Sequence, residues 1–350
     1  MLLRKGLFRI DTFLHHTIIK IIITFMDGFQ STFKSKDTEE WIDTVWTRPI
    51  GYRWALLFKK YNVHPITVTI LSVVIGVMSA FFFMHGSYRT EGTSGLIYNI
   101  VGVLLLAWAN FYDSADGQLA RMTGKTSLLG RILDGAAEDV WFFFLYCAVV
   151  VRYFLYHDLE FRWMGIADTE RNILIVFGVL FVVGWINGIC CHGWHCRLAD
   201  YYRQIHLFFL KGKDGSEFDN SEQQQEKYDS LPWKGHRVEK FFLGIYARYT
   251  RGQEKETPVF QMLMTKLKER YGDTANIPQE FRDEFRSRSL PLMKYTNILT
   301  FNVRAIALYT FYLLDFPWMF MVFEMTVMTS VYIYMKARHE AFCKELLAKL

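Results

Sequence analysis

The sequence predicts an all-α polytopic membrane protein, because long apolar runs recur along a chain that is rich in aromatic residues. Of its 350 residues, 51% are hydrophobic and 17% aromatic, whereas only 21% are charged. The mean hydropathy of +0.09 hides two populations, the apolar runs and a strongly charged middle segment. Runs of this length indicate helices, since the strands of a membrane barrel would alternate apolar and polar residues. The composition excludes disordered chains and nucleic-acid-binding tails, which are polar and poor in aromatics.

Six transmembrane helices are predicted from these runs. They cover about residues 67–83, 96–111, 140–156, 173–190, 298–314 and 318–334. Lys and Arg gather in the N-terminal segment, the connection between the second and third spans and the C-terminus, whereas the first loop holds only Arg89. Because basic loops remain on the cytoplasmic side, both termini and the long connection between the fourth and fifth spans are expected there.

The spans divide the chain into four regions. These are an amphipathic interfacial segment (1–64), the first four spans (65–193), a cytoplasmic polar insertion (194–294) and the last two spans with a C-terminal tail (295–350). The run at 17–26 is too short to cross a bilayer and is interrupted by Lys20, so it is expected to lie in the interface. A second interfacial helix is expected over 41–60, where Trp46, Ile50, Trp54 and Phe58 recur every four residues.

The insertion carries no recognisable motif. Residues 212–230 are rich in Ser, Gly, Asp, Glu and Gln, which indicates a flexible linker. Helical patterns follow over 259–271 and 278–288. Its role is left open by the sequence: it caps a site, mediates contacts between copies of the chain, or does neither.

Carboxylates gather where the second and third spans reach the membrane surface. Asp113 and Asp116 lie three residues apart and Asp134 and Glu138 four apart, so each pair shares a helix face. Acids at such a place are costly to desolvate, which indicates a functional site. Oxygen ligands favour a hard cation, Mg²⁺ or Mn²⁺, and two such ions suit a diphosphate during phosphoryl transfer. The sequence therefore predicts that the four side chains converge on one or two divalent ions.

Residues 113–138 fit the pattern D-x-x-D-G-x-x-A-R, eight residues, G-x-x-x-D-x-x-x-D, except that Glu138 replaces the final Asp. This pattern resembles the signature of the CDP-alcohol phosphotransferase (phosphatidyltransferase) family. Such proteins are six-helix membrane enzymes that move a phospho-alcohol from a CDP-linked donor to a second alcohol and release CMP. The resemblance covers the six spans and the lead-in, where Pro65 and Thr69 are similar to the family's P-N-x-x-T. It does not cover the first 40 residues or the insertion.

The resemblance implies a role for each matched residue. Asp113, Asp116 and Asp134 would hold Mg²⁺ or Mn²⁺ and the donor diphosphate. Glu138 would be the general base for the attacking hydroxyl and would also touch the second ion; it has nearly the intrinsic pKa of Asp but reaches one methylene further. Asp139 is a rival base, turned about 100° away along a helix. The nucleotide would be held by Gly117, Ala120, Arg121, Ser127 and Gly130.

Two weaker signals lie elsewhere in the spans. Asn302 and Arg304, in the fifth span, are candidates for binding the acceptor, since a guanidinium binds oxygens in pairs. Alternatively Arg304 pairs with a carboxylate in a helix, for which Glu324 is a candidate, or reaches the interface. Cysteine and histidine cluster at the end of the fourth span, as zinc ligands or as buried thiols followed by interfacial histidines. The cluster comprises Cys190, Cys191, His192, His195 and Cys196.

We therefore expect a phospholipid-synthesising transferase whose acceptor is an alcohol such as inositol or inositol phosphate. A headgroup transferase that takes CDP-ethanolamine, CDP-choline or CDP-inositol and acts on a lipid hydroxyl is the alternative. Two other classes are a transporter, for which paired broken helices and inverted repeats are not evident, and a catalytically silent membrane scaffold. The family commonly forms homodimers, so the resemblance adds a second copy to the expected partners.

Overall fold

Helices account for every regular element of the computed structural model, which describes residues 35–212, 216, 218 and 220–350. The predicted all-α class is confirmed for these residues. The expected interfacial helix over 17–26 lies outside them. The second one is helical, as η1 (Asp43–Thr47) and α2 (Arg48–Lys60). Trp54 and Phe58 of α2 pack edge-on against Tyr112 of α5, so one face of α2 is attached to the spans.

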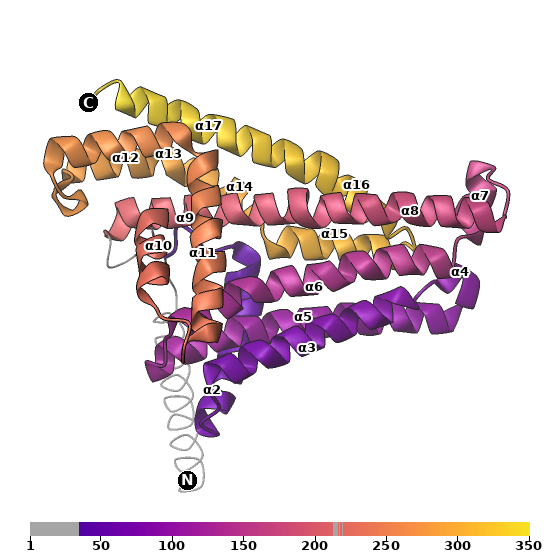
Figure 1. Cartoon of the computed structure of the whole chain (residues 1–350). Helices are drawn as coiled ribbons and strands as arrows, with labels where there is room; N and C mark the ends of the chain where they lie inside the picture. Colours follow the sequence, from indigo (N-terminus) through magenta and orange to yellow (C-terminus); the bar gives the residue numbers. More distant parts are fainter. Residues whose placement is uncertain (1–34, 213–215, 217, 219) are drawn as a thin grey trace, which may run out of the picture.

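The first part of the chain forms the bundle that holds the predicted acids. Its helices are α3 (Pro65–Met84), α4 (Tyr88–Glu91), α5 (Thr93–Thr123), α6 (Leu128–Leu155), α7 (Asp158–Met164), α8 (Glu170–Ile186), η2 (Asn187–His192) and α9 (Gly193–Lys211). In Figure 1, α3, α5, α6 and α8 run side by side, with α4 and α7 at one end. The core between them contains Phe83, Leu106, Trp141 and Phe142.

The second part contains the insertion and the last two predicted spans. Its helices are α10 (Ser221–Ser230), α11 (Arg237–Glu256), α12 (Pro258–Tyr271), η4 (Thr274–Asn276), α13 (Gln279–Ser289), η5 (Leu290–Leu292), α14 (Met293–Ile298), α15 (Phe301–Leu313), α16 (Trp318–Phe323), η6 (Glu324–Met328) and α17 (Thr329–Leu347). The helical patterns at 259–271 and 278–288 are confirmed as α12 and α13. Part of the expected linker is instead helix α10, which Asn220 caps by accepting a hydrogen bond from the Glu222 amide.

Among the described residues, four helices are long and apolar enough to cross a membrane: Pro65–Met84, Thr93–Thr123, Glu170–Lys211 and Trp318–Leu347. A fifth is added if α6 and α7, bent by 73°, count as one span. Helix α15 has 13 residues and is about 20 Å long, shorter than the roughly 30 Å of hydrocarbon in a bilayer. The chain is thus a polytopic membrane protein, while the count of six spans remains a prediction.

The helix that contains the fourth predicted span continues beyond residue 190. Helices α8, η2 and α9 form one helix of 42 residues that projects beyond the bundle (Figure 1). The reason is that α9 keeps an apolar face after its composition turns polar: Leu198, Tyr202, Ile205 and Phe209 are buried. This face forms a second core with α12, α13 and α17, around Phe260, Phe285 and Phe342. The insertion is therefore folded around the extension of a span.

Candidate active site

A tight connection brings the two halves of the acidic motif together. Helix α5 ends at Gly124, whose φ of 66° is accessible to glycine without strain. Helix α6 starts directly after Ser127, whose hydroxyl accepts a hydrogen bond from the Gly130 amide at 3.0 Å. The chain reverses within a few residues, so the end of α5 lies beside the start of α6. The acids of both helices meet at the end of the bundle opposite α4 and α7.

Three of the four predicted metal ligands form one cluster. Carboxylate oxygens of Asp113, Asp116 and Asp134 lie within 4.8 Å of one another. Thr69 of α3 donates a hydrogen bond to Oδ2 of the buried Asp116. Asp113 Oδ1 and Asp116 Oδ1 are also buried, and neither accepts a hydrogen bond from any described residue. Carboxylate oxygens left bare beside each other repel, and a divalent cation would relieve this, so the cluster fits the predicted metal.

A cavity of about 450 Å³ opens beside this cluster between α3, α5, α6 and α9. All five residues predicted to bind the nucleotide line it: Gly117, Ala120, Arg121, Ser127 and Gly130. Asp116 and Asp134 form part of its wall, together with four cationic side chains, those of Arg121, Lys125, Arg131 and Lys211. The cavity therefore combines two acids of the cluster with a wall suited to an anion.

Gly117 leaves room at one wall of the cavity. A Cβ atom at this position would lie 3.4 Å from Nη1 of Arg121, so the guanidinium lies over the glycine backbone. A Cβ atom alone would make ordinary van der Waals contact with Arg121, whereas a larger side chain would narrow the cavity. This is a physical reason for glycine one residue after Asp116.

Helix α9 contributes to the cavity from outside the motif. Gln204, Leu207 and Lys211 line it, at positions three and four residues apart on one face of α9. Sequence reasoning missed them because the fourth span was expected to end before them. The periodic apolar face of α9 is the signal that could have revealed the extension.

Glu138 points to a different set of partners. Its Oε1 lies 3.5 Å from Nη1 of Arg304 and 3.8 Å from Sγ of Cys196. Ligand atoms of Glu138, His192 and Cys196 lie within 4.8 Å of one another. The predicted convergence of four carboxylates therefore holds for three of them. Asp139 is 58% exposed and lies 3.0 Å from His192 Nε2, so the two neighbouring acids have separate partners.

Arg304 is fully buried and joins Glu138 to the sixth predicted span. Its Nε donates a hydrogen bond of 2.6 Å to Oε1 of Glu324, and the Tyr146 hydroxyl donates one of 2.6 Å to Oε2 of the same carboxylate. Its Nη1 lies 2.9 Å from Sγ of Cys196. The alternative in which Arg304 pairs with Glu324 is thus confirmed. A fixed positive charge this close to Cys196 and Glu138 opposes zinc binding at the Cys and His cluster.

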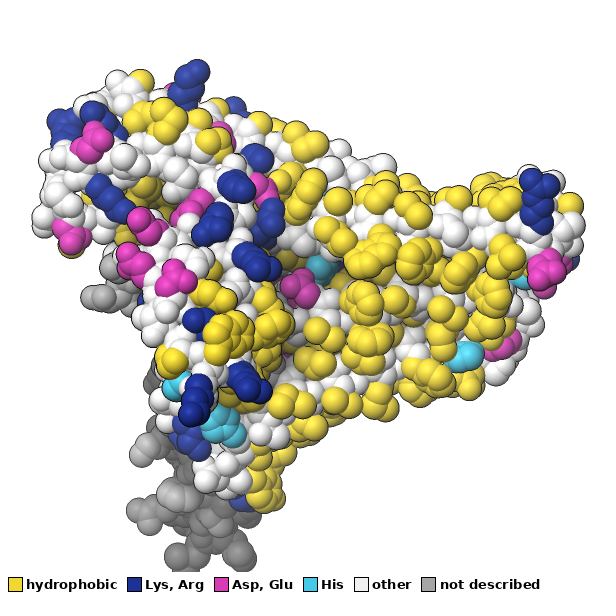
Figure 2. All heavy atoms as spheres, viewed as in Figure 1, with side chains coloured by type: hydrophobic (Ala, Val, Ile, Leu, Met, Phe, Trp, Pro, Cys, Tyr) yellow, Lys and Arg dark blue, Asp and Glu magenta, His cyan; other side chains and the backbone are white. Residues whose placement is uncertain are grey.

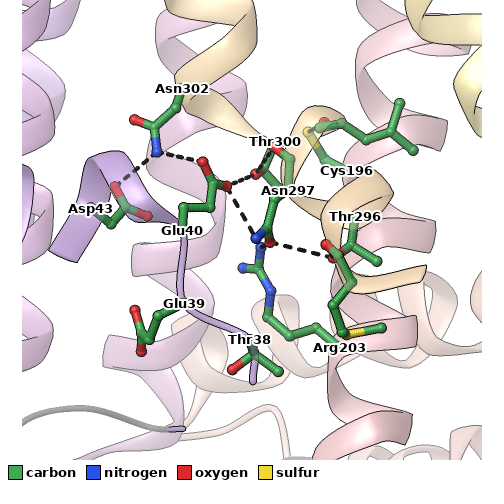
Figure 3. Close-up of polar contacts among 12 residues, drawn as sticks. Thr38, Glu39, Glu40, Asp43, Cys196, Arg203, Thr296, Asn297, Thr300 and Asn302 are labelled. Carbon is green, nitrogen blue, oxygen red and sulfur yellow. Dashed lines mark hydrogen bonds and ion pairs between the residues drawn. The ribbon is translucent and has the colours of Figure 1, made fainter. Parts of the chain in front are cut away.

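Asn302 forms hydrogen bonds with two acids of residues 35–47, the segment that precedes α2 and is called the lead-in below (Figure 3). Its amide nitrogen donates hydrogen bonds to Glu40 Oε2 at 2.7 Å and to Asp43 Oδ1 at 2.9 Å. The Thr300 hydroxyl donates to Glu40 Oε1 at 2.6 Å, and Arg203 lies 3.9 Å from the same carboxylate. Burial, reinforced by the nearby charge of Asp43, raises the pKa of Glu40. These acids attach the lead-in beside the site.

A second attachment lies three residues earlier. Asp37 Oδ2 accepts a hydrogen bond of 2.8 Å from Arg286 of α13 and lies 3.2 Å from Nε2 of His206 in α9. The hydrogen bond from Arg286 lowers the pKa of Asp37. Sequence reasoning missed Asp37, Glu40 and Asp43, because their partners are more than 150 residues away along the chain. The acidic run itself was the only local signal.

Residues 62–189 match a protein-family model described as CDP-alcohol phosphatidyltransferase. No curated protein and no solved structure matches the chain. The matched segment contains α3 to α8, and hence the acidic cluster, Glu138 and the nucleotide-side residues of the motif. It excludes α9, the insertion and Arg304. The resemblance read from the acidic motif is therefore confirmed over this segment.

Proposed function

From the premise that residues 62–189 form a CDP-alcohol phosphatidyltransferase domain, we propose that the chain transfers a phospho-alcohol from a CDP-linked donor to the hydroxyl of a second alcohol. The family carries out such transfers in phospholipid synthesis. The observation that carries the proposal is the placement of the Asp113, Asp116 and Asp134 cluster on a cavity lined by all five motif residues expected to hold the nucleotide.

Asp113, Asp116 and Asp134 would hold Mg²⁺ or Mn²⁺ between their oxygens. Such an ion supplies positive charge to the diphosphate as the leaving group departs. The bare oxygens of Asp113 and Asp116 support this assignment. Their spacing on α5 directs both towards Asp134 on α6.

The cavity would receive the donor's CDP moiety. Arg121, Lys125, Arg131 and Lys211 offer positive charge to the two phosphates, and the small residues Gly117 and Ala120 leave space for the cytidine. The volume of about 450 Å³ lies within the roughly 300–1,000 Å³ typical of small-molecule sites. Electrostatics and size thus both favour a nucleotide-sized anion.

Glu138 would accept the proton of the attacking hydroxyl. The hydroxyl oxygen forms a bond to the β-phosphorus, which carries the donor alcohol, and the bond from that phosphorus to CMP breaks with its electron pair leaving on CMP. The side chain of Glu138 is 26% exposed, which leaves it accessible to an acceptor, while Arg304 fixes its other side. Arg304 acts here as a positioning residue.

We place this site on the cytoplasmic face, on the strength of the basic residues that gather at the same end of the bundle. Substrate identity is tested with purified protein, CDP-diacylglycerol or a soluble CDP-alcohol, and a panel of alcohols. Product masses distinguish a phosphatidyl transfer to inositol or inositol phosphate from a headgroup transfer to a lipid hydroxyl. A chain that binds Mn²⁺ and nucleotide but releases no CMP with any pair would be a silent scaffold.

The test of the site uses Asp113→Asn, Asp134→Asn and Glu138→Gln, with Asp139→Asn as the matched control. We expect the two aspartate variants to abolish CMP release and Glu138→Gln to reduce it by about 10²–10⁴-fold, the usual contribution of a general base. Asp139→Asn should stay within a few-fold of the native rate. Loss of activity in Asp139→Asn with a normal rate in Glu138→Gln would contradict the assignment of the base.

A further inference from the structure

Helix α11 lies outside the family segment and has an unusual orientation. In Figure 1 it runs nearly perpendicular to α3, α6 and α8, at the end of the bundle that carries the acidic cluster. It contacts α6 and α9 of the spans and α10 and α12 of the insertion. A helix perpendicular to membrane spans lies along the plane of the membrane surface.

One face of α11 is committed to the protein. Lys240, Leu243, Ala247 and Thr250 are buried along it. A Cβ atom at Gly244 would lie 3.0 Å from the ring of Tyr228, so α10 packs closely against this helix. This packing determines which side of α11 remains exposed.

The remaining face carries large apolar side chains that are about half exposed. Val238, Phe241 and Ile245 follow one another at helical spacing and are 61%, 57% and 45% exposed. Trp233, just before the helix, is 51% exposed. Large apolar side chains in one exposed row indicate an interaction surface.

Exposed cations lie on the adjoining side of the helix, one before the apolar row and three after it. At 100° per residue, Arg237, Arg248, Arg251 and Lys255 fall on one side of Val238, Phe241 and Ile245, and Arg251 also donates a hydrogen bond of 3.4 Å to Gln225 of α10. An amphipathic helix with this division lies in a bilayer interface, apolar row towards the acyl chains and basic row towards the phosphates. A protein interface would instead be depleted of charge at its core.

The apolar row of α11 continues the lipid-facing surface of the spans. Ile70, Val74 and Phe81 of α3, with Ile175 and Val179 of α8, are at least half exposed. Figure 2 shows hydrophobic and basic side chains together along α11, next to the broad hydrophobic surface over these spans. The two surfaces would therefore meet the same bilayer.

We propose that α11 binds the surface of an anionic lipid bilayer on the side of the acidic cluster. Val238, Phe241 and Ile245 enter the boundary between headgroups and acyl chains, and Arg237, Arg248 and Lys255 contact lipid phosphates. The insertion is thereby held on the membrane beside the cavity. This inference does not depend on the proposed activity.

The test uses the full chain in lipid nanodiscs, with a nitroxide attached through a non-natural residue at 245, at 241 or at 239. Collision rates are measured with oxygen, which concentrates in lipid, and with a water-soluble nickel complex. We expect labels at 245 and 241 to collide more often with oxygen, and a label at 239 to collide more often with the nickel complex. Glu239 is exposed on a side of α11 away from the apolar row. Lipids with anionic headgroups should increase the preference at 245 relative to zwitterionic ones.

Two outcomes would overturn the proposal. Labels at 245 and 241 that favour the nickel complex as strongly as the label at 239 would place this face of α11 in water. Labels shielded from both reagents would show that protein, such as a second copy of the chain, covers the face. Thermal unfolding of each labelled chain, compared with the unlabelled one, confirms that the measurement reports the native fold.

Discussion

Single buried charges organise the centre of this molecule. Arg304 and Glu324 are both completely buried, and each charge is acceptable there only because the other is present. Tyr146 completes the hydrogen bonding of Glu324, and Cys196 and Glu138 approach the other end of the guanidinium. Removing one charge and removing both should therefore have different consequences.

We predict that Glu324→Gln destabilises the chain by about 3–5 kcal/mol, because it removes the closer of the two carboxylates that compensate the buried charge of Arg304 and leaves only Glu138, at 3.5 Å. The double variant Arg304→Met, Glu324→Met removes both charges, so its unfolding temperature should be close to that of the native chain. Its kcat should nevertheless fall while its KM for the donor is unchanged, since Glu138 loses its positioning partner. Thermal unfolding in one detergent and steady-state kinetics test this.

A double variant with native kcat would show that Arg304 does not position Glu138. Equal unfolding temperatures for the native chain and Glu324→Gln would show that the ion pair carries little stability. The two results are independent of each other.

Residue-level predictions from sequence succeeded where the relevant partners are near in the chain. Asp113 and Asp116 share a helical turn and a short connection returns Asp134 to them, so spacing alone brought the three together. The contact between Glu138 and Arg304 spans 166 residues, and that between Glu40 and Asn302 spans 262. Such pairings follow from how helices pack, which residue spacing does not encode.

At the level of elements, close approach between helices depends on small residues. A Cβ atom at Gly76 of α3 would lie 2.2 Å from the ring of Trp141 in α6, which is 1% exposed and therefore confined. Gly178 of α8 has no such neighbour, and an added Cβ there would meet nothing within 4 Å. The two glycines form a matched pair.

We predict that Gly76→Ala destabilises the bundle by about 1–3 kcal/mol, the usual cost of overpacking a core. Gly178→Ala should be neutral or stabilising by up to about 1 kcal/mol, because alanine favours the helix. Thermal unfolding of both variants under the same conditions checks the difference. Equal losses for both would mean that helix propensity, and not the contact with Trp141, decides the outcome.

The attachment of the lead-in should depend on pH through Asp37. Because its pKa in the folded chain lies below the ordinary value of 3.8, the contact with Arg286 is fully stabilising above about pH 4 and is lost as the pH falls through the lowered pKa. We predict that residues 35–47 of the native chain lose protection from hydrogen exchange on acidification. The Asp37→Asn chain, measured at the same pH values, accounts for the pH dependence of the intrinsic exchange rate.

In the Asp37→Asn chain the segment should exchange faster already at neutral pH and show a weaker response to acid. An identical pH response in both chains would assign the effect to other groups. The pKa of Glu40 is raised rather than lowered, so the attached state favours its protonated form. Acidification protonates Glu40 and therefore does not release the segment through this residue.

For the whole molecule, apolar length made four of the predicted spans recognisable among the described residues, whereas the extension of the helix that begins at Glu170 was not predicted. Composition changes near residue 194, but the periodic apolar face of α9 continues to Phe209. Helix α15 shows the reverse: it is too short to be recognised as a span by length. Its flanking residues nevertheless contact both ends of the bundle, Thr300 at Glu40 and Asp315 at Ser87.

These contacts predict that α15 leads the chain across the membrane, which makes six crossings. Both termini should then lie on one side, with the loop containing Arg89 on the other. Accessibility of terminal tags and of a tag in this loop to an impermeant reagent, in sealed and in opened vesicles, tests the count. Termini on opposite sides would show that α15 does not cross.

The continuous helix from Glu170 to Lys211 has a mechanical consequence. Its 42 residues amount to about 63 Å, so one end lies beside α7 and the other contributes Lys211 to the cavity. A rod of this length pivoting at its middle moves each end by roughly 3 Å for every 5° of tilt. Helices tilt when a bilayer thins, so the thickness of the surrounding membrane would set how near Lys211 stands to a bound diphosphate.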